Sequence, residues 1–343
     1  MPLPLIPVLI GAGAAIAGAV GIGKGAKAIS DNNKAKDINN DANTRVNNAK
    51  RYLESGREQT KKALEYLGSC KVKIMDEQMG RFVDLYGLLK NVTLKDSPGL
   101  EELKKFRIDQ HSFSQLKEMH DMVVPVAEGI LSGTIAGGAM AFGAYGAATT
   151  FAAASTGTAI ASLSGAAATN ATLAFFGGGA LAAGGLGVAG GMAILGGVVA
   201  GPALAVLGTI MGSKASANLD KAYSNLAEAQ KIAEELNVLH SVSAAIGRRA
   251  SMYSDLLNKL NHLFVPQIDH LKDIIKNEGV NFVQFSQDSQ KSVAVVAATA
   301  GAIKSLVDTP LLDDKGALTA DCDDVFKSVN DAYFKIKEAS GQK

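Results

Sequence analysis

LDKAYSNLAEAQKIAEELNVLHSVSAAIGRRASMYSDLLNKLNHLF, residues 219–264, is the stretch that decides the fold class. Apolar side chains recur in it at every third or fourth position, up to Leu236 and again from Val242 to Phe264, with one phase slip near Leu239. This spacing is the period of an amphipathic helix. Pro266 follows and is expected to end it, so the pattern predicts one helix of about 50 residues, a length typical of antiparallel coiled coils or long bundles.

A second long helix is predicted nearer the amino terminus. From Ser30 to Asn91 charged helix-forming residues alternate with an apolar stripe of the same period, which predicts a helix of about 60 residues. Ser97-Pro98-Gly99 breaks the pattern, and a shorter amphipathic helix is expected over Leu100–Val124. Two more helices are expected over Gln290–Val307 and Ala320–Ala339. Because no sustained two-residue alternation occurs, the sequence predicts an all-α, elongated bundle of long amphipathic helices.

Between the two long helices, from Gly129 to Ser213, there is no charged residue and no histidine. This uncharged stretch has a first apolar arm, Ile130–Ala153, then a part rich in Ser, Thr and Ala, and a second apolar arm, Leu173–Met211. The order predicts a Gly/Ala-rich hydrophobic helical hairpin. The first arm can cross a hydrocarbon core of about 30 Å, whereas the second is too long for one span and is expected to break at Gly177–Gly179 or at Gly201-Pro202.

Glycines four residues apart recur in this stretch and in the first residues of the chain. In water each glycine destabilises a helix by about 1 kcal/mol relative to alanine, so helix stability alone does not explain why glycine is frequent here. Small residues at this spacing let helix backbones touch in lipid, as in a glycine zipper. We therefore expect close packing, most economically inside a bilayer, at Gly13, Ala17, Gly21, Gly25, Gly133, Gly137, Gly187, Gly191, Gly197, Gly201 and Pro202. The alternative is a soluble bundle with a glycine-rich core.

Residues 1–29 form a further apolar region, and its lysines, from Lys24 on, follow the apolar run. A secretory signal carries its positive charge first, so we expect an uncleaved segment with these lysines on the cytoplasmic side of a membrane. A buried core helix is the alternative.

Four regions are thus predicted: an N-terminal apolar membrane-active segment (1–29), a long-helix arm (30–124), the hydrophobic hairpin (125–213) and a C-terminal long helix with its bundle (214–343). We expect synthesis in the cytoplasm and association with a membrane, the inner membrane in a bacterium, beside a soluble form.

No motif predicts an enzyme. Residues 18–25, GAVGIGKG, follow most of the phosphate-loop pattern, but Gly25 stands where a hydroxyl should bind magnesium. The dinucleotide-type run Gly185–Gly190 has no acidic residue after it until Asp220. The five histidines form no metal-binding pattern, and two cysteines, Cys70 and Cys322, predict reduced structural thiols. We expect no catalytic residue, cofactor or metal, and the net charge of +1 predicts no nucleic-acid partner.

The order of long helix, uncharged hairpin and long helix resembles the cytolysin A type of α-helical pore-forming toxin, and also apolipoprotein L. In the first family an elongated bundle hides a hydrophobic tongue that refolds into the membrane. In the second a Gly/Ala-rich helical hairpin lies between amphipathic helices. The resemblance implies a hairpin that is covered in one state and inserted in another. The additional N-terminal apolar segment departs from the toxin family and favours an intracellular membrane-active protein.

These patterns predict a non-enzymatic protein that inserts Ile130–Met211 into a lipid bilayer, forms a homo-oligomer and permeabilises the membrane. A membrane-anchored coiled-coil scaffold that recruits a protein partner through its long helices is an alternative of another class. A phage-type structural or ejection protein and a soluble helical bundle are further alternatives.

Overall fold

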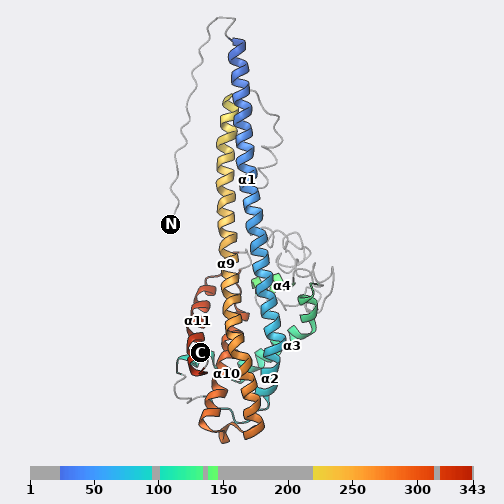
Figure 1. The fold of residues 1–343 in the computed structure, drawn as a ribbon, viewed down its shortest axis with the longest axis vertical. Coiled ribbons are helices and arrows are strands. Elements are labelled where there is room, and N and C mark those ends of the chain that lie inside the picture. The colour runs from blue at the N-terminus through green and yellow to red at the C-terminus, as the bar shows by residue number, and fades with distance from the viewer. Residues whose placement is uncertain (1–23, 95–100, 134–137, 146–218, 313–316, 342–343) are drawn as a thin grey trace.

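The computed structural model describes residues 24–94, 101–133, 138–145, 219–312 and 317–341. Within these ranges all regular structure is helical, and extended residues meet only at two isolated bridges, Lys90 with Asn281 and Leu312 with Leu318. The predicted all-α fold is confirmed (Figure 1).

A long helical rod opens the described chain. It consists of α1 (Lys24–Lys73), a π-helical turn η1 (Ile74–Met79) and α2 (Gly80–Gly87), which follow one another without a break. The 3-10 turn η2 (Glu101–Phe106), α3 (Gln110–Leu131), the short α4 (Gly138–Tyr145) and the second long helix α9 (Leu219–Glu278) come next. The turn η5 (Phe282–Gln284) then leads to α10 (Gln287–Asp308) and α11 (Asp321–Ala339). Both predicted long helices and both predicted final helices are present.

The two long helices lie side by side and run in the same direction (Figure 1). Near one end Asn225 Nδ2 donates to Asn39 Oδ1 at 3.0 Å, and near the other end Arg81 Nη2 lies 2.5 Å from Asp269 Oδ1. Residue numbers therefore rise together along the pair, so of the two packings expected for the long helix, antiparallel coiled coil or long bundle, the first is wrong. A short turn would force consecutive helices to run antiparallel, whereas the long stretch of chain between α1 and α9 lets both begin at the same end.

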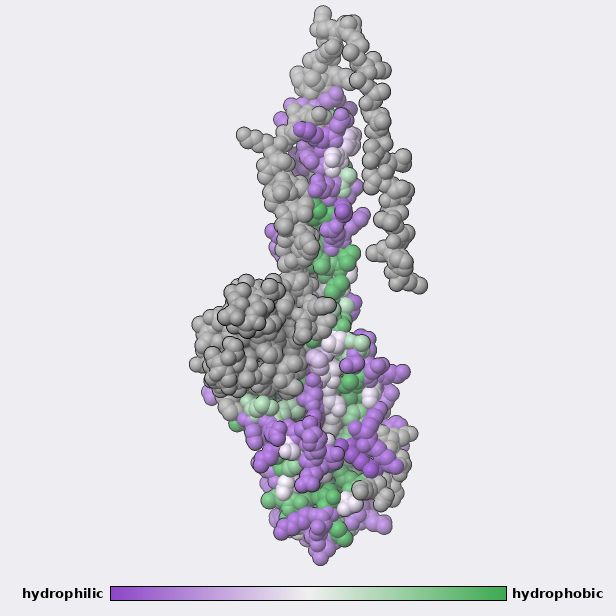
Figure 2. Space-filling view, turned by 180° about the vertical axis from the view of Figure 1, so that it is seen from behind, coloured by the Kyte–Doolittle hydropathy of each residue, from purple (hydrophilic) through white to green (hydrophobic). Residues whose placement is uncertain are grey.

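One half of this pair, which we call the stalk, comprises residues 31–55 of α1 and 219–239 of α9 (Figure 1). Alanine supplies many positions of its seam, so the helices approach closely while each buried residue removes little apolar area from water. The seam consists of Ala42, Val46, Ala49, Leu53, Ala229, Ile232 and Leu236. On the face drawn in Figure 2, apolar residues form a narrow band between polar ones along the described part of the stalk.

The other half of the pair belongs to a helical bundle, the base, in which α1, α2 and α9 meet α3, α10 and α11 (Figure 1). Every residue of α10 from Val293 to Ile303 is buried, the pattern of a helix at the centre of a core. Large side chains fill the space around it, for example Phe82 and Phe264, whose ring centroids lie 5.6 Å apart. The base therefore contains most of the apolar area that the described residues bury.

α9 continues through Pro266, where the sequence predicted its end. Proline removes the hydrogen bond that a residue at this position would donate to the carbonyl of His262. Both residues lie on the exposed side of α9, where water can satisfy that carbonyl. Beyond the proline the apolar stripe resumes with Ile268, Leu271 and Ile274, all buried, and their packing outweighs the lost bond.

The helix expected over Leu100–Val124 is divided. η2 covers its first residues, and α3 begins only at Gln110, where the Asp109 carboxylate accepts a hydrogen bond from the Ser112 backbone N–H at 2.7 Å as an N-cap. α3 then passes Val124 and crosses the expected boundary at residue 125.

The first apolar arm, expected as one helix from Ile130 to Ala153, is interrupted in the described residues. α3 ends at Leu131, and Gly133 follows with a φ of 74°, in the left-handed region that commonly ends helices. A new helix, α4, starts at Gly138. The arm is therefore not one continuous helix in this structure, and the helix expected across a bilayer stays a prediction.

Candidate functional site

The uncharged stretch enters the described structure mainly as α4, which packs on α1 where the stalk meets the base (Figure 1). Gly68 of α1 and Gly143 of α4 lie at the centre of this contact. A Cβ atom at Gly68 would overlap the carbonyl oxygen of Ala139, and one at Gly143 would overlap the carbonyl oxygen of Leu64. The two helix backbones therefore touch, which only glycine permits. We call this contact the dock.

Lys71 lies one turn after Gly68 and has no exposed surface. Its Nζ donates to the carbonyl oxygen of Phe142 at 3.4 Å and lies 6.0 Å from the centre of the Phe142 ring. No carboxylate of the described residues forms an ion pair with it. Burial lowers the pKa of Lys71 from its ordinary 10.5 to about 7, and attraction to Asp308 offsets only part of this effect. The dock thus holds a buried amine that is uncharged much more easily than a surface lysine.

The carboxyl end of α4 is tied to the connection between α10 and α11. The carbonyl oxygen of Ala144 accepts hydrogen bonds from the backbone N–H groups of Leu311 and Leu312, at 2.8 and 3.0 Å. Asp308, at the end of α10, pairs with Lys304 of the same helix at 2.6 Å. α4 is therefore held by α1 along one side and by this connection at its end.

Directly after Lys71 and Lys73 the rod changes to π-helical geometry at η1. His120 of α3 packs there: its Nδ1 donates to the carbonyl oxygen of Met75 at 2.9 Å, and its ring lies where a Cβ of Gly80 would be. Single π-helical turns are frequent at functional sites. Here the turn gives α3 a fixed position next to the dock.

A polar layer separates the core of the stalk from the core of the base. The Thr60 hydroxyl donates to the carbonyl oxygen of Ser243 (2.8 Å) or of Gly56 (2.9 Å), and it lies 3.0 Å from the Ser243 hydroxyl. Ser243 is buried, whereas Val242, which the apolar pattern placed inside, is 43% exposed. The phase slip predicted near Leu239 therefore marks the joint between stalk and base.

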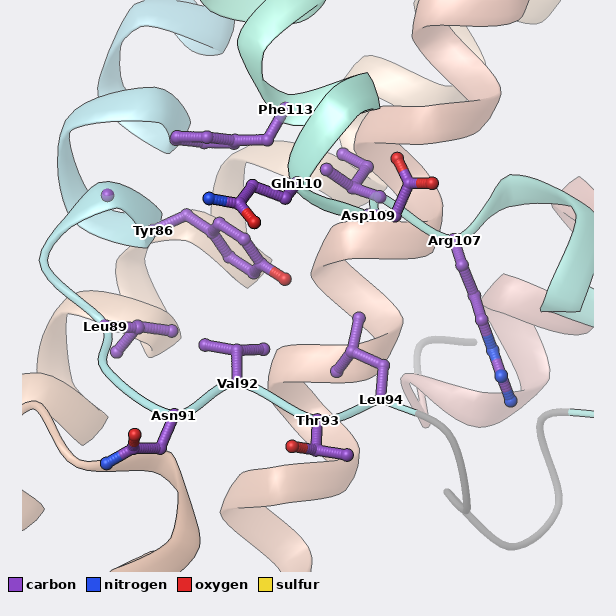
Figure 3. A pocket seen from close by; sticks show the side chains of 12 residues that line it. Tyr86, Leu89, Asn91, Val92, Thr93, Leu94, Arg107, Asp109, Gln110 and Phe113 are labelled. Atoms are coloured by element: carbon purple, nitrogen blue, oxygen red, sulfur yellow. The ribbon is translucent and has the colours of Figure 1, made fainter.

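A groove of about 670 Å³ lies at the far end of the base, between the end of α2 and the start of α3 (Figure 3). The Tyr86 hydroxyl points into it, and burial raises the pKa of Tyr86 to about 12, so this group stays protonated. The Asp109 carboxylate accepts the N-capping hydrogen bond from Ser112, which lowers its pKa. Polar side chains such as Asn91 and Gln110 line the groove together with apolar ones such as Leu89, Val92 and Phe113.

Few of the glycines predicted to pack in lipid are described. Gly133 ends α3, and no atom of the described residues lies within 4 Å of where its Cβ would be, so it makes no close contact with a described helix. Gly25 lies in the first turn of α1. The others, with Pro202, lie outside the described residues, and their packing stays a prediction: Gly13, Ala17, Gly21, Gly137, Gly187, Gly191, Gly197 and Gly201. The expected break points, Gly177–Gly179 and Gly201-Pro202, lie there too.

The two residues of α1 that form the dock, Gly68 and Lys71, were missed from the sequence. Both stand on a single helical face with Leu64 and Met75, at spacings of four, three and four residues. A lysine on an apolar stripe is a usable signal, since lysine is almost never fully buried unless it is paired. A glycine beside it indicates where another backbone could approach.

In the part of the chain that the structure describes, no three metal-binding side chains of His, Cys, Asp or Glu come together. Among the helices described, none has both the length and the apolar character needed to cross a bilayer. Cys70 and Cys322 are free thiols, the first half-buried and the second buried.

Comparison with known proteins adds no relative, because no protein-family model, no curated protein and no solved structure matches the chain. Function has to be inferred from the residues and contacts above.

Proposed function

We propose that this is a non-enzymatic membrane-inserting protein whose uncharged stretch leaves the helical body, enters a lipid bilayer, oligomerises and permeabilises the membrane. The observation that carries the proposal is the absence of any charged residue or histidine from Gly129 to Ser213, between two helices rich in charge. A helix in water normally keeps one polar face, and this stretch has few residues from which to build one. Lipid is the environment that its composition fits best.

The dock supports the proposal because it holds the start of this stretch through one short helix. α4 is eight residues long. Phe142 and Ala144 are buried in the core of the base, with Ala139 and Met140 packed against it, and the close approach of two glycines, the bond from Lys71 and the two backbone bonds to Ala144 complete the attachment. Opening so short an element costs far less free energy than unfolding the base.

The parallel packing of the long helices supplies a geometric argument. α4 sits on α1 at Gly68, whereas the start of α9 is placed by the bond between Asn225 and Asn39. These two levels of α1 are about 45 Å apart at about 1.5 Å per residue. The chain between Tyr145 and Leu219 has to join them, so release of α4 would free a loop that α3 anchors at one end and α9 at the other. A hairpin that inserts as a unit needs such anchoring.

In this proposal the protein acts at the cytoplasmic side of a membrane, with residues 1–23 as a second membrane-active segment and lysines from Lys24 on remaining outside the lipid. The body and the released hairpin would correspond in outline to the cytolysin A type of pore-forming toxin. The lipid bilayer and further copies of the same chain are then its partners.

Release of a trapped dye from liposomes, with flotation of the same sample, tests the proposal on the full-length protein. We expect both dye release and flotation. Changing Gly187→Leu together with Gly191→Leu should lower dye release about tenfold, which corresponds to about 1.4 kcal/mol of lost helix packing.

The matched control is Ala189→Leu with Ala193→Leu, which adds leucine to the same segment on the opposite face of a helix. It should leave release unchanged. Equal loss in both variants would contradict close packing through the glycines, and failure of the wild type to float would contradict membrane insertion.

A second candidate, the membrane-anchored scaffold, is favoured by apolar side chains on the outside of the long helices. Val238 and Val242 lie one turn apart on α9 and are 62% and 43% exposed, and Tyr223 on the same helix is 56% exposed. Such a surface could contact a partner helix. Flotation without dye release would favour this function over permeabilisation.

A further inference from the structure

Lys71 is the most unusual charged residue among those described. It is completely buried under α4, and among the described residues the only acceptor that its Nζ meets is the main-chain oxygen of Phe142, at 3.4 Å. Transfer of an ammonium ion from water into such a place is costly unless a carboxylate lies against it. The docked arrangement therefore favours the neutral amine.

The charges around Lys71 do not remove this cost. On α10, Asp308 attracts the cation but is itself paired with Lys304. On α9, Asp255, Lys259 and His262 are exposed, as are Glu128 on α3 and Lys73 on α1. α4 contributes no Asp, Glu, Lys, Arg or His. Undocking of α4 would thus be the direct route by which Nζ reaches water.

We infer that Lys71 makes the docking of α4 depend on pH: the docked form holds the neutral amine, and release of α4 lets Nζ take up one proton from water. Protonation and docking then oppose each other. This inference rests on the proposed function only in assigning a purpose to the release, which would be the first step of membrane insertion.

The direction and range of the effect follow from the lowered pKa. Above pH 10.5 the amine is neutral in both forms, and docking is tightest. Between pH 10.5 and about 7 the released form binds a proton that the docked form does not, so release is favoured about tenfold more for each unit by which the pH falls. Below about pH 7 both forms are protonated, and the dependence levels off.

Thiol labelling of α4 in the full-length protein, without membranes, tests this inference. The reporter is Ala144→Cys, at a fully buried position, in a background with Cys70→Ser and Cys322→Ser. The labelling rate is measured from pH 6 to 10 with Lys71 present and with Lys71→Met. The ratio of the two rates cancels the reactivity of the thiol itself, which also varies with pH.

We expect the ratio, Lys71 over Lys71→Met, to rise about tenfold per unit as the pH falls from 10 toward 7 and then to become constant. Lys73→Met, which replaces an exposed lysine in the same turn, should behave as wild type. A ratio that stays constant over the whole range, or an equal effect of Lys73→Met, would overturn the inference.

Two further variants keep the test decisive if the first ones disturb the fold. Met140→Cys, at a half-buried position of α4, replaces the reporter, and Lys71→Gln replaces Lys71→Met. Because no lipid is present, a pH-dependent release without dye release from liposomes would retain this inference and reject the proposed function. Dye release from liposomes without a pH-dependent release of α4 would reject this inference and retain the proposed function.

Discussion

The stalk and the base are built from the same two helices, yet they bury very different side chains. In the stalk α1 and α9 meet through alanines and a few larger residues, whereas in the base they meet α3, α10 and α11 through leucine, methionine and phenylalanine. Stabilisation by apolar burial grows with the area removed from water, so the base sets the global stability and the stalk opens first. The dock lies at the end of the base that is nearest to the stalk, and its Phe142 and Ala144 belong to the core of the base.

The largest expected effect is in the base. Phe264→Ala removes a fully buried ring that packs on Phe82 and should lower the free energy of unfolding by about 4 kcal/mol. Denaturant unfolding followed by circular dichroism measures it. A loss below about 1 kcal/mol would mean that the base does not set the global stability.

The next effect is at the dock. Gly68→Ala places a Cβ against the Ala139 carbonyl oxygen and should cost about 3 kcal/mol, expressed as release of α4 while the base stays folded. Hydrogen exchange of the α4 amides measures the release. Gly87→Ala is the matched control, since among the described residues its Cβ would meet only the Phe113 ring, at 3.6 Å, and it should leave the α4 amides protected. Equal protection in both variants would show that the glycine contact does not hold α4.

In the stalk, Leu53→Ala should cost about 2 kcal/mol at a residue that is only 1% exposed. Because the stalk has its own core, the loss should appear mainly as faster hydrogen exchange of amides in residues 31–55 and 219–239. A matching fall in the stability of the base would indicate that both parts unfold as one unit and would remove the distinction between them.

The smallest effect concerns the polar layer between the parts. Replacing Thr60→Val together with Ser243→Ala removes both hydroxyl groups, so no buried partner is left unsatisfied, and stability should change by about 1 kcal/mol or less. The apolar seam would then run on from the stalk into the base. We expect slower exchange of the stalk amides, and faster exchange would show that the layer stabilises the joint.

Local patterns in the sequence were sufficient to predict the helices. They were not sufficient to predict how helices far apart in the chain pack against one another. The period of Leu219–Phe264 predicts a helix because each turn repeats the same local contacts. Whether that helix runs parallel or antiparallel to α1 depends on the path of the chain between them, which periodicity does not describe. Pro266 was expected to end α9 because proline lowers helix stability by a roughly fixed amount. The free energy gained by burying Ile268 and Leu271 beyond it depends on the assembled base and outweighs that loss.

The candidate site shows the same limit. Gly68 and Lys71 belong to an ordinary-looking charged helix, and their role exists only because α4, far along the chain, packs on them. Spacing of the other glycines predicts close packing but does not identify the partner helix. The apolar pattern placed Val242 in the core, whereas the structure buries Ser243 instead. The reason is that a polar layer, not an apolar one, follows the phase slip.

The most direct test of the central claim is hydrogen exchange of the full-length protein with and without liposomes. We expect the amides of α4 to lose protection when liposomes are added, while the amides of the buried helix α10 keep theirs. Unchanged protection of α4 under conditions in which dye is released, or equal loss in α4 and α10, would contradict release of a docked hairpin from an intact body.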